Sequence, residues 1–278
     1  MLLADRDSYW QNARREIHKS ARELMAQHQD ELEKGLAYSK LLHGNVHKKE
    51  LALTFDDGPH RGYTERLLVI LSHYEAPATF FVVGEMAERY PELILAEQAA
   101  GMEIGNHTYH HVSLPKIPAE FVLDEIKACG AVILSITGKA PDWFRPPGGQ
   151  YDQDIAEASE FLGYTMALWT DDPGDYAHPR PEALLKKTLD KLSPGGIILL
   201  HDGIEETIKI LPALLEGIRK RGYTLVTLDR LKETARTPRA VGRGEELWGT
   251  FDFRGSHTQV SSRNVNAMTN RNLFRGNK

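Results

Sequence analysis

Two adjacent aspartates are the first residues in this sequence whose types could do chemistry. Asp56 and Asp57 stand in the stretch LALTFDDGPH, directly after an apolar run and before Gly58 and Pro59. Asp, Gly and Pro are ordinary turn residues, so alone they could mark only the end of a strand. A turn needs at most one carboxylate, however, and two neighbouring anions repel each other. If the two aspartates belong to a functional site, other residues of the chain must supply the groups that act with them.

A pair of histidines in GNHTYHH offers such partners. His107 and His111 are four residues apart, a spacing that would separate them by ~13 Å on a strand but would place them on one face of a helical turn. Paired histidines on a helical turn are typical of zinc sites, which also need a further ligand such as a carboxylate and an open position. Asp57 could supply that carboxylate. His110 lies three residues after His107, so His107 and His110 are a second possible pair of ligands.

Short apolar runs alternate with helical periods from Leu51 onward. The expected strands are Leu51–Phe55, Ala78–Val83, Met102–Gly105, Trp143–Arg145, Thr165–Trp169, Gly196–Leu200 and Thr224–Thr227, with helices around 64–73, 91–100, 119–136, 153–162, 181–192 and 206–221. This alternation predicts parallel βα units, and near-continuous apolar strands such as GIILL fit a sheet that is buried on both faces. A closed or nearly closed barrel and an open doubly wound sheet both satisfy the pattern. No GxGxxG motif follows the first strand, so the usual dinucleotide signature is missing.

The ionisable residues cluster where the expected strands end. These residues are Asp56 and Asp57 after the first strand, His107 after the third, Arg145 at the end of the fourth, Asp172 and Asp175 after the fifth, and His201 and Asp202 after the sixth. In a parallel βα barrel the carboxyl ends of the strands converge on one rim, where active sites lie. The placement therefore predicts an active site at that rim.

Five motifs in order resemble those of the polysaccharide deacetylases, the NodB-like carbohydrate esterases that remove N- or O-acetyl groups from sugars. They are TFDDG (54–58), HTYHH (107–111), RPPGG (145–149), DPGDY (172–176) and LLHDG (199–203). The resemblance covers roughly Leu51 to Leu231. It implies an α/β fold, a distorted (β/α) barrel of the NodB-homology type with about seven parallel strands, to which this chain adds an N-terminal helix.

The resemblance also implies a role for each matching residue. It makes Asp56 the catalytic base and His201 the catalytic acid, with Arg145 pairing with the base and Asp175 orienting the acid. The implied metal ligands are Asp57, His107 and His111, with His110 outside the ligand set. A divalent cation against Asp57 would resolve the repulsion between the two aspartates. Zinc is the expected metal, and cobalt, iron, manganese or nickel would also suit these ligands.

The implied reaction is hydrolysis of an acetamide. The metal would polarise the carbonyl and activate a water, Asp56 would take the proton of that water, and His201 would protonate the leaving amine. The implied substrate-binding residues are Pro146, Gly148, Tyr176 and Leu199. Gly148 stands where the family usually has Tyr, and Tyr176 stands where it usually has Trp, so substrate choice is expected to differ while the chemistry survives.

The expected substrate is an acetylated carbohydrate such as peptidoglycan or chitin-type N-acetylglucosamine, with O-acetyl groups left open. Two alternatives remain: a pseudo-enzyme that binds sugar polymers without cleaving them, and a non-haem iron oxygenase, which also uses two histidines and a carboxylate. The oxygenase is the weaker alternative because that class usually has an antiparallel β fold.

The composition of the chain indicates which classes of protein it can belong to. The chain has 278 residues, 41% hydrophobic and 26% charged, with a formal net charge of −5, which predicts a globular protein and no nucleic-acid partner. No run is long enough to span a membrane and no export signal is visible. The protein is therefore expected at the cell surface or secreted if a signal was removed, and otherwise in the cytoplasm; its oligomeric state stays open.

The sequence also predicts a division of the chain into three parts. Residues 1–45 would form a helical extension, with one polar helix over about 5–43, followed by a catalytic domain over 46–235 and a polar tail over 236–278.

Overall fold

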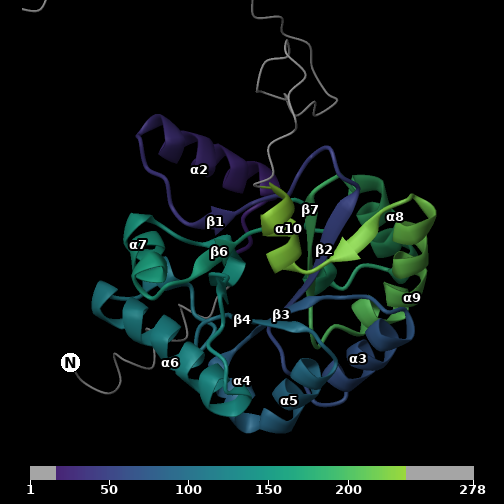
Figure 1. Cartoon of the computed structure of the whole chain (residues 1–278), viewed down its shortest axis with the longest axis horizontal. Helices are drawn as coiled ribbons and strands as arrows, with labels where there is room; N and C mark the ends of the chain where they lie inside the picture. Colours follow the sequence, from purple (N-terminus) through teal and green to yellow (C-terminus); the bar gives the residue numbers. More distant parts are fainter. Residues whose placement is uncertain (1–16, 236–278) are drawn as a thin grey trace, which may run out of the picture. The chain divides into compact units, whose positions relative to one another are not determined.

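A curled parallel sheet wrapped by helices forms the body of the protein (Figure 1). The structure is a computed structural model and describes residues 17–235. The strands are β1 (Lys40–Leu41), β2 (Glu50–Asp56), β3 (Thr79–Val82), β4 (Glu103–Asn106), β5 (Trp143–Phe144), β6 (Thr165–Ala167), β7 (Gly196–His201) and β8 (Thr224–Val226). The helices are α2 (Ala21–Glu33), α3 (Thr64–His73), α4 (Gly84–Arg89), α5 (Pro91–Ala99), α6 (Ala119–Thr137), α7 (Gln153–Phe161), α8 (Pro181–Lys191), α9 (Glu205–Lys220) and α10 (Leu228–Ala235), with 3₁₀ turns η1 (Leu114–Lys116), η2 (Pro147–Gly149) and η3 (Asp175–Ala177).

The strand order confirms the predicted distorted barrel. The sheet runs β1-β6-β5-β4-β3-β2-β7, β8 also pairs with β2, and every pairing is parallel. All seven expected strands are present. A parallel bridge between Asp171, just after β6, and Ile198 of β7 brings the two ends of the curl together. The barrel alternative is therefore correct and the open doubly wound sheet is not.

The N-terminal segment differs from the single long helix that the sequence predicts. Within the described residues the helix covers only Ala21–Glu33, because Ser20 caps its start in a capping box and Gly35, at a φ of +74°, ends it. The chain then forms β1, which pairs with β6, and Leu41 and Leu42 are buried. This segment thus joins the sheet and its core, although the division into domains at residue 45 stays a prediction. The expected helical residues before 17, and the expected tail 236–278, lie outside the described residues.

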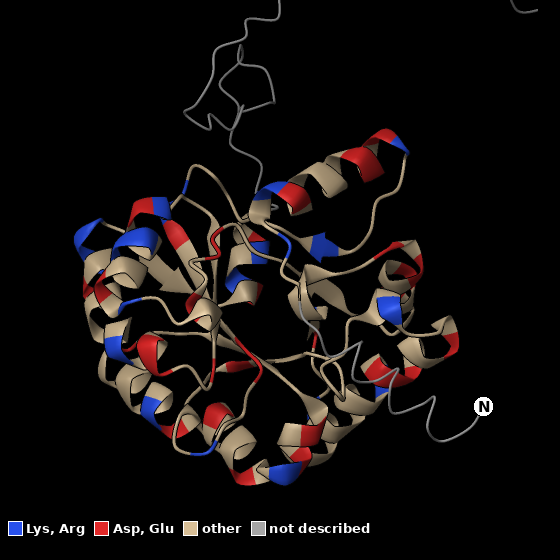
Figure 2. Cartoon of the chain, turned by 180° about the vertical axis from the view of Figure 1, so that it is seen from behind, with Lys and Arg blue, Asp and Glu red and all other residues tan. Residues whose placement is uncertain are grey.

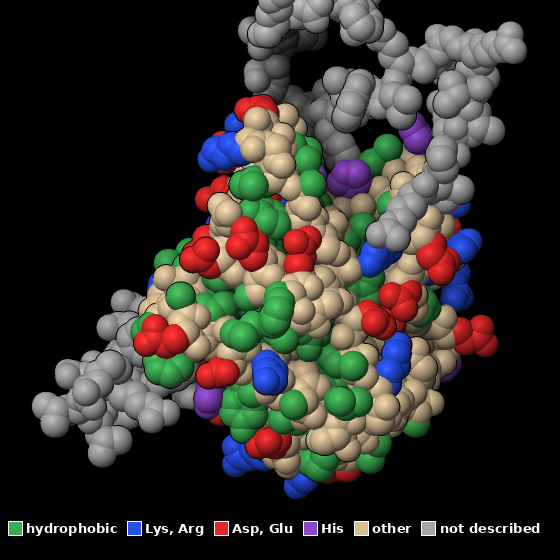
Figure 3. All heavy atoms as spheres, turned by 60° about the vertical axis from the view of Figure 1, so that its left-hand side comes forward, with side chains coloured by type: hydrophobic (Ala, Val, Ile, Leu, Met, Phe, Trp, Pro, Cys, Tyr) green, Lys and Arg blue, Asp and Glu red, His purple; other side chains and the backbone are tan. Residues whose placement is uncertain are grey.

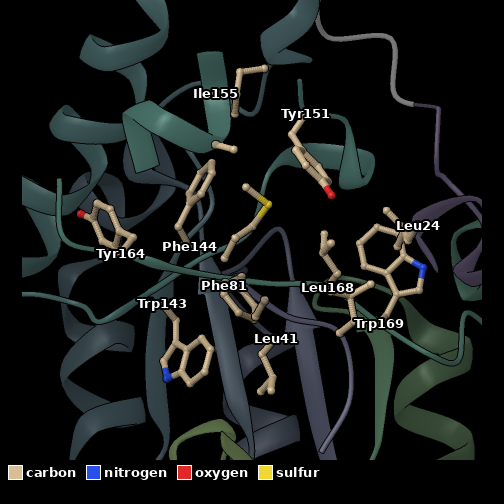
Figure 4. Close-up of a cluster of buried hydrophobic side chains, with 14 of the residues drawn as sticks. Leu24, Leu41, Phe81, Trp143, Phe144, Tyr151, Ile155, Tyr164, Leu168 and Trp169 are labelled. Atoms are coloured by element: carbon tan, nitrogen blue, oxygen red, sulfur yellow. The ribbon is translucent and has the colours of Figure 1, made fainter. Parts of the chain in front are cut away.

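Apolar side chains fill the barrel and fasten α2 to it. Figure 4 shows Leu24 of α2 beside Trp169, which follows β6, with Leu168 and Tyr151 close by. Leu24 is fully buried, and both Leu24 and Trp169 belong to the hydrophobic cluster that also contains Phe81 of β3. Burying a leucine side chain of this kind contributes about 1.5–3 kcal/mol. Helix α2 is therefore anchored next to the carboxyl ends of β3 and β6.

Helix α10 lies across the amino end of the barrel. Its Leu228 and Leu231 are fully buried. The carboxylate of Glu103, at the start of β4, accepts hydrogen bonds from the backbone N–H groups of Leu228 and Asp229, and the indole N–H of Trp143, at the start of β5, donates to Asp229 Oδ1 at 2.9 Å. This end of the barrel is closed by packing and by satisfied polar groups.

The outer helices carry the solvated surface of the protein. Figure 2 shows acidic and basic residues mixed along them, and Figure 3 shows hydrophobic side chains scattered between charged ones. Phe161 of α7 is 80% exposed, and isolated exposed apolar residues are normal on a protein surface. Among helices between residues 17 and 235, none has the length and apolarity needed to cross a bilayer.

Candidate active site

The register of the parallel strands brings the ionisable residues to one rim. Asp56, the last residue of β2, lies beside His201, the last residue of β7, and beside Phe81 of β3. The register of β4 and β5 pairs Asn106 with Phe144, so the residues that follow them, His107 and Arg145, emerge at the same level. Parallel pairing alone therefore aligns the candidate residues of four separate strands.

One carboxylate and two imidazoles converge at this rim. Asp57, His107 and His111 each offer one ligand atom, and these atoms lie within 4.8 Å of one another. Asp57 Oδ1 is 3.0 Å from His111 Nε2 and 3.5 Å from His107 Nε2. Burial acts to raise the pKa of Asp57, but the adjacent His111 and His107 hold that pKa well below its usual value. The carboxylate is therefore ionised, as a metal ligand must be.

The two histidines meet through a bend rather than through the helical turn that their spacing suggested. No helix includes residues 107–111. The side-chain oxygen of Asn106 accepts a hydrogen bond from the Thr108 N–H at 2.9 Å, and Thr108 and His111 both have positive φ, at 66° and 53°. These left-handed residues turn the chain back so that the two imidazoles face each other, with ring centroids 5.0 Å apart. The prediction of a helical turn is wrong because an Asn-centred turn forms there.

Hydrogen bonds orient the imidazoles. His107 Nδ1 lies 2.7 Å from the carbonyl oxygen of Arg145, and because a carbonyl only accepts, Nδ1 carries the hydrogen and leaves the Nε2 lone pair directed at Asp57. His110 instead points away, its Nδ1 2.6 Å from Glu125 Oε1 and its backbone N–H 2.9 Å from Glu125 Oε2. The buried Glu125 thus separates His110 from the cluster.

The donor atoms at the rim fit a divalent cation. Asp57 Oδ1 and His107 Nε2 are buried, yet neither makes a hydrogen bond with any residue that the structure describes. Buried polar atoms without a partner cost free energy unless a ligand satisfies them. Two imidazole nitrogens and one carboxylate form the protein donor set of a catalytic zinc site, in which water or substrate supplies the remaining ligand.

Arg145 fixes Asp56, the first aspartate of the pair. Its guanidinium is completely buried and donates to Asp56 Oδ1 at 2.7 Å, to Thr54 Oγ1 at 2.8 Å and to the carbonyl of Ala167 at 3.0 Å. It also lies over the ring of Phe81, 4.1 Å from the centroid. A buried charge is tolerated only when it is paired and hydrogen-bonded, and these contacts supply that need. Asp56 is thereby held rigidly beside Asp57.

A histidine–aspartate pair faces the cluster from β7. His201 Nδ1 donates to Asp175 Oδ1 at 2.7 Å, and Asp175 Oδ2 accepts from the His201 backbone N–H at 2.8 Å and from the Thr207 hydroxyl at 2.6 Å. Burial would lower the pKa of His201, but the Asp175 carboxylate, together with Asp57 and Asp56, raises it to about 10. The paired Asp175 therefore favours the protonated form of His201, whose Nε2 lies 3.3 Å from His18 Nε2.

The four candidate substrate-binding residues lie around this centre at different depths. Pro146 and Gly148 are buried in and beside η2. Tyr176 of η3 is 38% exposed and donates its hydroxyl hydrogen to Asp172 Oδ2 at 3.1 Å, whereas Leu199 of β7 is fully buried. Gly148 has a φ of +61°, a conformation in which a residue with a side chain would be strained.

Several supporting residues were not predicted from the sequence. Thr54, Glu125 and Thr207 hold Arg145, His110 and Asp175 respectively. Thr54 lies two residues before Asp56 on the same strand and so faces the same side of the sheet, a signal that could have identified it. Glu125 and Thr207 lie on distant helices, and nothing in their local sequence marks them. His18 was also missed, and it contacts His201.

The sequence and the fold of this chain are similar to those of known proteins. A family model described as polysaccharide deacetylase matches residues 43–167. A peptidoglycan-N-acetylglucosamine deacetylase of Bacillus cereus is 35% identical over 189 residues, which cover 66% of this chain and 88% of that protein.

The chain belongs to the polysaccharide deacetylase family.

Further relatives of this polysaccharide deacetylase family member include both enzymes and a pseudoenzyme. A chitooligosaccharide deacetylase of a Bradyrhizobium species is 33% identical over 198 residues, covering 66% of this chain and 90% of that protein. A crystal structure of a peptidoglycan N-acetylglucosamine deacetylase matches with a TM-score of 0.69 and 27% identity, over 75% of this chain and 98% of that chain. A CE4 family pseudoenzyme from Bacillus anthracis matches with a TM-score of 0.68 and 25% identity, over 71% and 70% of the two chains.

Proposed function

We propose that this chain is a divalent-metal-dependent deacetylase that hydrolyses N-acetyl groups of an N-acetylglucosamine-containing glycan and releases acetate. One observation carries the proposal. The cluster Asp57–His107–His111 lies beside a carboxylate held by a buried arginine, at the same rim as a histidine held by a buried aspartate. A hydrolase needs this set of groups: a Lewis acid, a base and an acid around one reacting carbon.

The cation would be held by Asp57 Oδ1 and the Nε2 atoms of His107 and His111. When bound, it supplies a Lewis acid that polarises the acetyl carbonyl and makes water more acidic. Zinc is the proposed ion because it favours two imidazoles with one carboxylate, and cobalt, iron, manganese and nickel are further ions for the same ligands.

Asp56 would act as the general base. Its Oδ1 is tied to Arg145, and its Oδ2 lies 3.7 Å from His107 Nε2, on the side of the ligand cluster. The guanidinium fixes the direction of the carboxylate. As the new C–O bond forms, Asp56 takes the proton that the attacking water loses.

His201 would act as the general acid. Its Nδ1 hydrogen is committed to Asp175, which leaves the Nε2 hydrogen for the leaving nitrogen. When the C–N bond breaks, that proton moves to the nitrogen, and the products are a free amine and acetate. The raised pKa of His201, about 10, keeps it charged until the step that uses its proton.

The substrate side of the site would be formed by Pro146, Gly148, Tyr176 and Leu199. Tyr176 would line the slot for the acetyl methyl group, with Leu199 beneath it, and the Gly148 N–H would lie near the developing oxyanion. The relatives' activities on peptidoglycan and chitooligosaccharides support an N-acetylglucosamine substrate. O-acetylated sugars remain a second substrate class to test.

Acetate release from a panel of acetylated glycans tests the proposal. The panel contains N-acetylglucosamine oligomers, peptidoglycan fragments and acetylxylan, and oxygen uptake is recorded in parallel. We expect acetate from at least one N-acetylated substrate and no oxygen uptake. Binding of a glycan without acetate release by the zinc-loaded protein would support the pseudo-enzyme alternative, which the similarity to the Bacillus anthracis protein keeps relevant. Oxygen uptake would support the iron oxygenase.

A further inference from the structure

Residues 17–20 cross the substrate side of the candidate site as an extended arm, which we call the N-terminal arm. The backbone N–H of Lys19 donates to the carbonyl of Gly148 at 2.9 Å, and the side-chain amide of Gln150 donates to the carbonyl of Ile17 at 2.8 Å. Both partners lie in or directly after η2, the RPPGG turn. The arm is therefore attached to the turn that would carry the oxyanion-binding N–H.

His18 projects from this arm onto the catalytic acid. Its Nε2 is 3.3 Å from His201 Nε2. Because His201 Nδ1 is committed to Asp175, Nε2 is the ring nitrogen of His201 that remains for a substrate, and His18 Nε2 is in hydrogen-bond contact with it. The nitrogen that would protonate the leaving group is thus already in contact with a side chain of the same molecule.

His18 also covers Tyr176. The two rings are stacked, with centroids 4.0 Å apart and an interplanar angle of 4°. Tyr176 is a proposed wall of the acetyl slot, so the imidazole occupies the face on which a substrate would pack. One side chain therefore takes two contacts that the proposed substrate needs, the acid proton and the aromatic wall.

The arm has a fixed end from which it could swing. Ser20 caps α2, and Leu24 of that helix is buried with Trp169 and packs near Gly149. Residues 17–19 are held by the hydrogen bonds to η2 and Gln150, by the ring stack of His18 and by contacts of Lys19 with Gln27 and the Tyr151 ring, and Ile17 is 64% exposed. The helix can thus stay in place while the arm lifts.

We propose that His18 is an intramolecular occupant of the substrate site, and that the N-terminal arm must leave the cleft before an N-acetylated sugar can contact Tyr176 and His201. The inference rests on the proposed function, since it assigns the occluded contacts to that substrate. A site that is open for only a fraction of the time binds its ligand more weakly by that same fraction. Loss of one ring stack and one hydrogen bond should increase the open fraction about ten-fold.

Kinetics of three full-length proteins test the inference: the wild type, His18→Ala, and His47→Ala as a control. His47 is an exposed histidine of the loop before β2. With the zinc-loaded proteins and a soluble N-acetylglucosamine oligomer, we expect His18→Ala to raise kcat/KM about ten-fold, mainly through a lower KM, while His47→Ala matches the wild type. A lower kcat/KM in His18→Ala would show that His18 serves the reaction, and an unchanged value would show that the arm does not compete. Either result overturns the inference.

A second variant releases the arm without changing His18. Gln150→Ala removes the hydrogen bond to Ile17, so it should raise kcat/KM in the same direction by a smaller factor. A decrease in this variant would contradict a competing arm.

Hydrogen exchange separates failure of this inference from failure of the proposed function. The Lys19 amide, bonded to Gly148, should be protected in the wild type, and it should lose protection in His18→Ala or when tetra-N-acetylchitotetraose is added. If no protein releases acetate, the proposed function fails and the exchange result alone decides the arm. Unchanged protection of residues 17–20 in the presence of the tetrasaccharide would then overturn the inference.

Discussion

The two ends of the barrel are built from the same strands but in opposite ways. At the amino end, α10 packs two fully buried leucines against the core, and the polar groups around it find partners, as in the bonds between Glu103 and α10. At the carboxyl end, Asp57 Oδ1 and His107 Nε2 are buried without a hydrogen bond among the described residues. The polar groups that α10 contacts are satisfied within the fold, whereas these proposed ligand atoms at the other end are not hydrogen-bonded.

This difference indicates that the amino end mainly stabilises the fold and that the carboxyl end mainly carries the proposed chemistry. Closing the amino end stabilises the fold, so that the carboxyl end can hold two adjacent carboxylates, three non-glycine residues with positive φ (Asp57, Thr108 and His111) and a buried arginine. Strained and charged groups persist only where the surrounding structure determines their positions. Substitutions at the carboxyl end should therefore change activity more than stability, and substitutions at the amino end should do the reverse.

The largest expected effect comes from removing the metal. Exhaustive chelation should abolish acetate release, because the cation is proposed to polarise the carbonyl and to activate water. Addition of zinc or cobalt to the apoprotein should restore the activity, and thermal unfolding of the apoprotein should remain cooperative. Full turnover by protein that elemental analysis shows to be metal-free would refute the assignment of the cluster.

A smaller but more specific effect separates the two neighbouring histidines. His111→Ala should lose bound zinc, because it removes a proposed ligand, whereas His110→Ala should keep most of it, because His110 is hydrogen-bonded to Glu125 away from the cluster. Metal content per folded protein, measured by elemental analysis, checks both variants. The reverse order of zinc loss would mean that the wrong imidazole had been assigned.

At the amino end, Leu231→Ala should destabilise the protein without changing its chemistry. Truncating a fully buried leucine costs about 2–5 kcal/mol of unfolding free energy, because apolar contact is lost and a cavity remains. Denaturant unfolding measures the loss, and acetate release per folded molecule should match the wild type. A large fall in kcat with unchanged stability would break the proposed division between the two ends.

The smallest expected effect concerns one polar contact at the same end. Trp143→Phe removes the indole hydrogen bond to Asp229, which should reduce stability by about 0.5–1.5 kcal/mol beyond the change in packing. A double-mutant cycle with the wild type, Trp143→Phe, Asp229→Ala and the double variant isolates the contribution of the hydrogen bond. Additive losses in that cycle would show that the contact contributes nothing.

Much of this architecture could be predicted from the sequence because it follows from local pattern. The alternation of apolar runs and helical periods predicted all seven strands from β2 to β8, and the placement of Asp56, His107 and His201 at strand ends predicted a shared rim. Parallel pairing fixes that rim geometrically. The family resemblance was carried by the same residues, and the comparisons confirm it.

What could not be predicted depends on contacts between distant segments. The helix over 5–43 was predicted from polar periodicity, but Gly35 ends α2 and the free edge of β6 recruits Lys40 and Leu41 as a strand. The bend at His107–His111 arises from the Asn106 side chain, which spacing alone does not reveal. Nothing local in the sequence places His18 on His201, since that contact joins residues 183 positions apart.

The central claim is that Asp56 and His201 act as base and acid at the carboxyl end, and their dependence on the leaving group tests it most directly. Turnover of an N-acetylglucosamine oligomer and of an activated aryl acetate is measured for Asp56→Asn and His201→Ala, both loaded with zinc. Asp56→Asn cannot accept the proton of water, so both activities should fall by ~10² or more. His201→Ala should lose the amide activity but keep much more of the ester activity, because an activated phenolate leaves without a proton. Equal proportional losses of both activities in both variants would contradict the assignment.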